Sequence, residues 1–288
     1  MKKLLAVGMM IVLSATALVG CGKDKAASGN AADGAVKVID IELTDEEYAF
    51  GVDKTQPELL ESVNAFIKEI QENGTFDAIC NNYFGDGTPV AVTSAAYDES
   101  KDQLVVATNA AFEPFEYTQG DSYYGIDMEI AKALADYLGK ELVIQNMEFD
   151  AVCLSVGQQK CDVAMAGLTI KPDREEYVNF SVPYYSASQK LIVLSENTEF
   201  DGCTDAASVE AILSAKDGSV KVGVQNGTTG QFYSEGDADW GFDGFPVQTV
   251  GYKNGSLAVQ DLINGNIQYV IIDSAPAACI TEAINKMQ

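Results

Sequence analysis

Hydrophobic and polar positions alternate between two periods along most of this chain. From Val36 onward, short runs with the two-residue period of a strand are separated by longer stretches with helical spacing. The clearest helix is expected over Pro57–Asn73, with Pro57 near its start and Gly74 as its stop signal. Its apolar positions recur on one face: Leu59, Leu60, Val63, Phe66, Ile67 and Ile70. The alternation of strands and helices predicts an α/β protein with parallel sheets covered by helices on both faces.

The remaining elements follow from the same pattern. The expected strands are Val36–Ile41, Tyr48–Val52, Leu104–Thr108, Glu141–Gln145, Asp162–Ala166, Lys190–Leu194, Val220–Gln225, Pro246–Val250 and Gln268–Ile272. The other expected helices are Phe76–Phe84, Asp127–Leu138, Phe149–Gln158, Thr204–Ala215, Gly230–Ser234, Gly255–Asn264 and Pro276–Lys286. Gly85–Asp102 lacks any helical period and is rich in small and polar residues, so we expect a flexible internal linker there.

Ligands of open α/β sheets bind beyond the carboxyl ends of the strands. In this chain that rule selects four places, each of which follows or ends an expected strand: Asn109, Gly167, Gln225–Thr229 and Asp273.

The first residues predict export. Lys2 and Lys3 precede the apolar run Leu4–Gly20, which is typical of a secretory signal and is short for a permanent span of about 20 residues. The run ends in Leu18-Val19-Gly20-Cys21, which resembles the lipobox of bacterial lipoproteins and implies cleavage before Cys21 and acylation of that cysteine. A single membrane anchor with an incidental cysteine is the alternative. Residues 1–20 are thus the expected signal peptide, and the small, polar residues 21–35 form a lipid-anchored tether.

Composition excludes several classes of function. Cleavage leaves 268 of the 288 residues, enough for two lobes, and loss of Lys2 and Lys3 takes the net charge from −25 to −27, which disfavours nucleic acid as a partner. The chain has no histidine, so Ser-His-Asp and Cys-His catalysis and His-ligated metal sites are excluded. We expect neither a cofactor nor a metal.

The cysteines beyond Cys21 are odd in number and show no CxxC spacing. Three of them, Cys80, Cys153 and Cys279, lie within apolar helical patterns and are interpreted as small buried hydrophobes. One disulfide bond remains open as an alternative, with Cys153 and Cys161 as the nearest pair.

Arg174 is the most specific candidate for ligand binding. It is the only arginine of the chain and follows the segment DVAMAGLTIKPD, which begins as a strand. A guanidinium group offers a planar fork that matches a carboxylate, and the start of a helix adds backbone donors. The alternative is a surface arginine paired with Asp173 or Glu176.

Three stretches resemble the polar-amino-acid solute-binding proteins of ABC importers, also called solute-binding protein family 3. They are Thr44–Gly85, the stretch LVVATNAAFEPFEY from Leu104 with GIDMEIAKALADYLGK behind it, and the segment around Arg174. In that family the first stretch closes the chain and the second opens it, so this chain resembles a circular permutant. The resemblance implies a two-lobe periplasmic-binding-protein fold with two crossing strands as hinge. Lobe one would be continuous over residues 51–187, including the linker 85–102, and lobe two would combine residues 36–50 and 188–288.

The resemblance also assigns roles at the site. The ligand carboxylate would bind Arg174 and the turn KVGVQNGTTG through Thr228 and Thr229. By residue types alone, this turn is also compatible with a phosphate cradle, although the P-loop lysine and the Rossmann glycine spacing are absent, or with an ordinary strand–helix turn. The ammonium group would bind Asp273, Thr169 and Gly167, whereas Asp273 before Pro276 is also a good helix N-cap.

Four further residues complete the implied pocket. Phe112 and Phe149 match the aromatic walls of the family, with plain core packing as the alternative. Asn109 and Gln225 are neutral where relatives that bind cationic side chains often have an acid, which favours a neutral, polar ligand side chain; Glu113 or Asp150 could still reach the pocket.

The resemblance implies a monomeric lipoprotein, anchored through Cys21 on the extracytoplasmic face of the cell membrane, that binds an L-amino acid and delivers it to an ABC permease. We expect no enzymatic activity. The alternatives are a sensory amino-acid-binding ectodomain, which a gene neighbourhood without a permease and ATPase would favour, and a dehydratase-type enzyme on the same fold, which would need an acid–base pair above the ligand.

Overall fold

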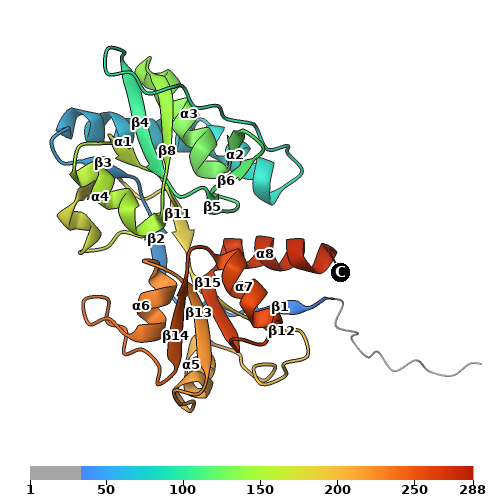
Figure 1. Ribbon diagram of the computed structural model, residues 1–288. Helices are drawn as coiled ribbons and strands as arrows, with labels where there is room; N and C mark the ends of the chain where they lie inside the picture. Colours follow the sequence, from blue (N-terminus) through green and yellow to red (C-terminus); the bar gives the residue numbers. More distant parts are fainter. Residues whose placement is uncertain (1–33, 288) are drawn as a thin grey trace, which may run out of the picture. The chain divides into compact units, whose positions relative to one another are not determined.

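The computed structural model describes residues 34–287, which form two mixed five-stranded sheets with helices around each (Figure 1). The predicted signal peptide, Cys21 and nearly all of the tether lie outside the described residues. The order of the first sheet is β10 (Val178–Phe180), β3 (Gly51–Asp53), β9 (Val163–Ala164), β4 (Gln103–Thr108) and β8 (Glu141–Asn146). The order of the second is β1 (Val36–Ile39), β12 (Gln189–Leu194), β15 (Tyr269–Asp273), β13 (Lys221–Gln225) and β14 (Gln248–Tyr252).

Helices cover both faces of the first sheet. Successive side chains of β4 point to opposite sides, and each side packs into a different apolar cluster. Leu104 and Val106 belong to the apolar cluster with α1 (Pro57–Glu72) and α3 (Ile126–Leu138), whereas Val105 and Ala107 belong to the cluster with α4 (Val152–Gly157). A second helix, α2 (Thr75–Phe84), packs on α1 and α3, and the short helix η1 (Phe149–Ala151) leads into α4. We call this sheet with its helices lobe one.

The second sheet is built in the same way. Ile192, Val270 and Ile272 pack with α7 (Gly255–Ile263) and α8 (Ser274–Lys286). Their strand neighbours Leu191 and Ile271 pack on the other face, where α5 (Ala206–Ser214) and α6 (Thr229–Glu235) contribute apolar side chains. We call this sheet with its helices lobe two.

Both sheets are mixed rather than purely parallel, in contrast to the sequence prediction. In lobe one β4 pairs in parallel with β8 and β9, whereas β3 and β10 are antiparallel additions. In lobe two β13 is parallel to β14 and β15, whereas β12 and β1 are antiparallel. The antiparallel strands are those next to the segments that cross between lobes, so the chain enters them directly instead of through a crossover helix.

Two crossing segments pair between the lobes. Strand β2 (Glu46–Tyr48) is antiparallel to β11 (Tyr185–Ala187), and Figure 1 shows this ribbon running between the two sheets. The single strand expected over Tyr48–Val52 is therefore divided into β2 and β3, since the chain leaves the ribbon before it joins the sheet of lobe one. A small sheet of β5 (Ala111–Phe112), β6 (Glu116–Gln119) and β7 (Ser122–Tyr124), absent from the sequence prediction, follows β4.

The segment expected to be a flexible linker, Gly85–Asp102, is held along lobe one. Val92 is buried and exchanges backbone hydrogen bonds of 2.8 and 2.9 Å with Tyr123. The Ala95 N–H donates to the carbonyl of Leu142 at 2.9 Å, and Ser94 Oγ accepts from the Ile144 N–H at 2.8 Å. Backbone bonding orders this segment although its side chains show no period.

The five described cysteines are all free, so the alternative of a Cys153–Cys161 disulfide is wrong. Cys153 is buried, as predicted, whereas Cys80 and Cys279 are only partly buried. Within residues 34–287 no helix combines the length and apolar character needed to cross a membrane.

Candidate ligand-binding site

Polar side chains from both lobes gather at the ends of the strands that the sequence selected. Asn109 follows β4, Gln225 ends β13 and Asp273 ends β15, and all three are buried. Thr169, on the loop after β9, and Thr229, at the start of α6, are also buried. These residues lie at or just after the carboxyl ends of strands from two different sheets. Hydrogen bonds between their side chains connect the two lobes.

Arg174 is 8% exposed on the short helix η2 (Arg174–Glu176) and reaches both lobes. Its Nη1 donates to the carbonyl of Thr169 at 2.8 Å in lobe one, and its Nη2 donates to the carbonyl of Gly227 at 3.0 Å in lobe two. The guanidinium carbon lies 5.1 Å from the ring centre of Phe149. Among the described residues Arg174 makes no ion pair, so the alternative of a surface pair with Asp173 or Glu176 is wrong.

The threonine hydroxyls form a chain that crosses the lobes. Thr229 Oγ1 donates to Thr169 Oγ1 at 3.2 Å, and Thr169 Oγ1 donates in turn to Glu46 Oε2 at 2.7 Å. Thr228 Oγ1 instead donates to the carbonyl of Gln225 at 2.9 Å, within its own turn. The structure therefore brings Thr169 and Thr229 together and leaves the Thr228 hydroxyl in a local bond.

Asp273 is buried and accepts a hydrogen bond of 2.5 Å from the Tyr48 hydroxyl at Oδ2. Burial raises the pKa of Asp273 to about 7, and the nearby charge of Glu46 adds to this shift, while the bonds from Tyr48 and Gln189 oppose it. Asp273 stands at the N-cap of α8, but its side chain makes no capping hydrogen bond. The N-cap alternative is wrong for this side chain, which faces Tyr48.

Gly167 lies where only glycine fits without strain. Its φ is +53°, and a Cβ there would meet Phe112 Cε1 at 3.2 Å and Tyr48 Cε2 at 3.3 Å. Its N–H donates to Asp127 Oδ2 at 2.9 Å, and Asp127 Oδ1 accepts from the Tyr184 hydroxyl at 2.6 Å. Burial raises the pKa of Asp127 to about 7. The Phe112 ring is therefore both buried in the core and in contact with the loop of Gly167.

The two neutral candidates, Asn109 and Gln225, bind each other across the lobes. Gln225 Nε2 donates to Asn109 Oδ1 at 3.1 Å, and Asn109 Nδ2 donates to the carbonyl of Met147 at 2.6 Å. Gln225 Oε1 is buried, and no donor within the described part of the chain bonds to it. The pair thus presents an unused acceptor at the interface.

The candidate residues border several cavities rather than one. Thr169 and Glu46 line a cavity of about 520 Å³ that also contacts Trp240, whereas Arg174 and Phe149 line one of about 190 Å³. Asn109 lines a third cavity, of about 420 Å³.

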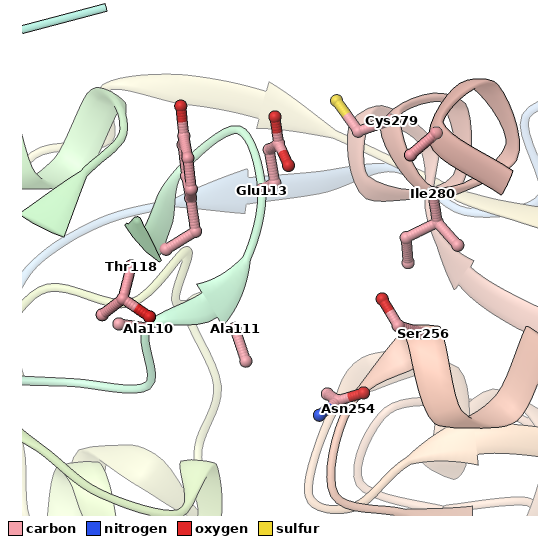
Figure 2. Close-up of a pocket in the computed structure, with 10 residues that line it drawn as sticks. Ala110, Ala111, Glu113, Thr118, Asn254, Ser256, Cys279 and Ile280 are labelled. Atoms are coloured by element: carbon pink, nitrogen blue, oxygen red, sulfur yellow. The ribbon is translucent and has the colours of Figure 1, made fainter. Parts of the chain in front are cut away.

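The two carboxylates that the sequence left open lie at the margins. Asp150 lines the cavity of Arg174. Glu113 lines a separate cavity of about 250 Å³, in which Figure 2 shows it opposite Cys279 and Ile280 of α8. Burial raises the pKa of Glu113. No group of three or more potential metal ligands occurs among residues 34–287.

Several polar residues of the site were missed by sequence reasoning. Glu46 and Tyr48 come from β2, upstream of Asn109–Asp273, the range that holds every contact expected from the sequence. Gln189 and Glu116 are fully buried, and no donor from residues 34–287 bonds to Gln189 Oε1 or to either Glu116 carboxylate oxygen. Burial raises the pKa of Glu116 well above its ordinary value. The sequence signal that could have indicated these residues was weak: each polar residue stands beside a short apolar run.

Two α/β lobes joined by paired crossing strands, with buried polar groups from both lobes at their interface, define a two-lobe solute-binding protein of the periplasmic type. The chain belongs to the bacterial extracellular solute-binding proteins, family 3, whose model matches residues 104–278. The match begins at β4, so Val36–Asp53 and the helices α1 and α2 lie outside it.

Individual relatives agree with this family. The chain is 31% identical to ABC transporter arginine-binding protein 1 of Escherichia coli (strain K12) over 60% of this chain and 64% of that protein. It is 33% identical to a cyclohexadienyl dehydratase of Pseudomonas aeruginosa over 34% of this chain and 37% of that protein. The chain thus spans less than two thirds of the length of these relatives. An ancestral arginine-binding protein bound to arginine is similar in structure, with a TM-score of 0.53 and 31% identity over 64% of this chain and 75% of that one.

Proposed function

We propose that this protein binds an L-amino acid between its lobes and delivers it to an ABC importer. The observation that carries the proposal is Arg174, a buried guanidinium without a carboxylate partner among the described residues, bonded to one carbonyl of each lobe. A carboxylate ligand would match its planar fork better than two carbonyl oxygens do, because charge-assisted bidentate bonds are stronger than bonds to neutral acceptors. Family membership supports the same class of ligand.

The two charged groups of the amino acid would bind at opposite ends of the hydroxyl chain. Arg174 and Thr229 would hold the carboxylate, with Phe149 beside the guanidinium. Thr228 would join them once its hydroxyl turns away from the Gln225 carbonyl. Asp273, the Thr169 hydroxyl and the Gly167 carbonyl would hold the ammonium group, and Phe112 would exclude water. Since these groups come from both lobes, the ligand would stabilise the arrangement in which the lobes touch.

The ligand side chain is inferred to carry N–H donors. Asn109 and Gln225 form a neutral pair, and Gln225 Oε1 is a buried acceptor without a donor. Relatives with arginine in their names make arginine the first ligand to test. The neutral Asn109–Gln225 pair makes glutamine the second, because an amide side chain supplies donors without a formal charge.

Isothermal titration calorimetry of residues 22–288 against the twenty amino acids tests the proposal. We expect one amino acid, or a small group with N–H-bearing side chains, to bind, and Arg174→Ala to remove binding while the thermal unfolding curve stays cooperative. Equal binding by the variant would sink the role of Arg174. Absence of binding by the unaltered chain would sink the proposal.

We also infer that the chain is a circular permutant of its family, with lobe one over residues 51–187 and lobe two over 36–50 and 188–288. Two observations support this order. The family model begins only at Leu104, and the end of α8 meets the start of β1, where Asn285 Nδ2 donates to the Val36 carbonyl at 2.8 Å. A short link between them would restore the family order.

Anchoring through Cys21 to the outer face of the membrane is a further proposal, based on the lipobox-like sequence. Metabolic labelling with palmitate should mark the full-length chain, and Cys21→Ser should remove the label and release the protein from the membrane. Labelling that survives in Cys21→Ser would contradict it.

The second candidate function is a dehydratase-type enzyme. It is favoured by the similarity to a cyclohexadienyl dehydratase and by the raised pKa of Asp273, which would let this carboxyl act as an acid near neutral pH. Incubation of the protein with each bound amino acid and with cyclohexadienyl carboxylic acids, followed by NMR, separates the two functions, since only the enzyme would produce new resonances.

A further inference from the structure

Glu46 stands at the meeting point of the two lobes and of the crossing ribbon. It is 4% exposed, and all its hydrogen bonds are to neutral donors. Its Oε1 accepts from Thr44 Oγ1 at 2.6 Å and from Gln189 Nε2 at 3.0 Å, and its Oε2 accepts from Thr169 Oγ1 at 2.7 Å. Among residues 34–287 no lysine or arginine forms an ion pair with it.

The backbone register places Glu46 beside Asp273. Gln189 lies directly opposite Asp273 in the pairing of β12 with β15, and the amide of Gln189 binds Glu46. On β2, Glu46 and Tyr48 are two residues apart and share the buried face, and the Tyr48 hydroxyl binds Asp273. Two independent contacts therefore bring the carboxylates of Glu46 and Asp273 into one cluster.

Among residues 34–287 no cationic side chain forms an ion pair with either carboxylate of this cluster. Two buried carboxylates repel each other. The charge of Glu46 accordingly helps to raise the pKa of Asp273. Next to them, Gln189 is fully buried, and among residues 34–287 no donor bonds to its Oε1. A group with several N–H donors and a positive charge would satisfy all three side chains.

We propose that Glu46 is a second anionic residue of the ligand site and shares the α-ammonium group of the amino acid with Asp273. This inference rests on the proposed function and deepens it. Thr169 would then serve both ends of the site, since its hydroxyl donates to Glu46 and accepts from Thr229. Because Glu46 belongs to the crossing ribbon, the ligand would also tie the ribbon to both lobes.

The test compares Glu46→Gln with Glu47→Gln. Glu47 is the next residue of β2 and borders the same cavity, but it is exposed and its side chain bonds to none of Asp273, Gln189 and Thr169. The second variant therefore makes the same charge change and leaves the contacts of Glu46 in place. Affinities are measured for the best amino-acid ligand of the unaltered chain and for its analogue without the α-amino group. We expect Glu46→Gln to weaken amino-acid binding about 10- to 100-fold, the range of a charge-assisted hydrogen bond, and to leave analogue binding unchanged. Glu47→Gln should change neither.

The possible outcomes of these binding measurements can be told apart. Equal loss for amino acid and analogue would mean that Glu46 has only a structural role and would overturn the inference, as would unchanged affinity for both. If the unaltered chain binds an amino acid and Glu46→Gln binds it equally well, this inference fails and the proposed function stands. If the unaltered chain binds no amino acid, both fail. If Glu46→Gln does not give a cooperative thermal transition, Glu46→Asp is used, in which the shorter side chain withdraws the carboxylate and should give an intermediate, amino-acid-specific loss.

Discussion

Lys171 Nζ lies 3.2 Å from the centre of the Phe232 ring, and this contact joins the two lobes. The same atom lies 3.9 Å from the centre of the Trp240 ring, and the lysine side chain is 2% exposed. Lys171 comes from the loop after β9 in lobe one, and Phe232 comes from α6 in lobe two. Asp173 is its nearest acidic partner, at 3.6 Å. The arrangement is a cation–π clasp between the lobes: Phe232 borders the cavity of Arg174, and Trp240 borders the cavity of Glu46 and Thr169.

Replacement of Lys171 by methionine should loosen this clasp. A desolvated cation–π contact contributes roughly 0.5–2 kcal/mol, so amino-acid affinity should fall about 2- to 30-fold, and small-angle scattering of the free protein should give a larger radius of gyration. Burial lowers the pKa of Lys171 to about 8, so the cation is lost at higher pH. The difference between the variant and the unaltered chain should therefore shrink at pH 9. An equal difference at pH 7 and pH 9 would contradict a cationic role.

Arg174→Lys should weaken ligand binding strongly although it keeps the positive charge. A lysine cannot make the two bonds that the guanidinium makes to Thr169 and Gly227, nor offer a bidentate fork to a carboxylate. We expect a loss of about 100-fold or more in calorimetry, near that of Arg174→Ala, because one charge-assisted fork is replaced by a point charge. A loss below about fivefold would show that charge alone is recognised. Lys160→Ala, an exposed lysine of lobe one, is the control.

Ligand affinity should depend on pH through Asp273. Its pKa is about 7 in the folded, ligand-free protein, whereas an ammonium ligand requires the carboxylate. Affinity should therefore rise from pH 5 to pH 7, by up to about tenfold per pH unit, and level off above. Calorimetry in buffers of different ionisation enthalpy should detect proton release below pH 7. In Asp273→Asn, affinity should be low and this pH dependence absent; an unchanged profile would contradict the assignment.

The same shift has a consequence for stability. Between its ordinary pKa of 3.8 and about 7, Asp273 binds more protons in the folded than in the unfolded state. Its contribution to the free energy of unfolding is therefore present at low pH and lost as the pH rises through 7. Without ligand, Asp273→Asn should weaken the fall of melting temperature from pH 5 to pH 8.

Gly167→Ala should destabilise the protein more than Gly120→Ala. Both glycines have positive φ, +53° and +62°, so each substitution has a backbone cost of about 1 kcal/mol. A Cβ at Gly120 meets nothing within 4 Å, whereas at Gly167 it meets the rings of Phe112 and Tyr48. The additional overpacking should cost about 1–3 kcal/mol in the free energy of unfolding by urea. Equal losses in the free energy of unfolding for the two variants would show that the rings of Phe112 and Tyr48 move aside without cost.

A reordered chain tests the circular permutation. It begins at Asp86, runs to Lys286, continues through a short Gly-Ser link to Val36, and ends at Gly85. Because Asn285 already bonds to Val36 and Gly85 is exposed, the new join and the new ends should not disturb either lobe. We expect the same ligand and an equal affinity by calorimetry. A soluble, folded product that does not bind would contradict the equivalence of the two orders.

Most of the secondary structure followed from local patterns. The apolar stripe from Leu59 to Ile70 placed α1 to within one residue of its observed end, because a 3.6-residue period over several turns is a strong local signal. Short strands without such a period, notably β5, β6 and β10, were missed, since two to four residues carry too little of a period to be recognised. The antiparallel edges of both sheets were also missed, because pairing direction depends on where the chain crosses between lobes.

The sequence by itself determined the α/β alternation, the absence of histidine chemistry, and the positions of Arg174 and Asp273 at the ends of recognisable elements. Only the tertiary structure decided which acids lie together at the interface of the lobes. Glu46 is 123 residues from Thr169 and 143 from Gln189 along the chain, and these contacts depend on the register of β2, β11, β12 and β15. Hydrophobic periodicity is a property of neighbouring residues and can be read locally. The placement of a buried charge is fixed by packing between distant segments, so it becomes visible only when the sheets are assembled.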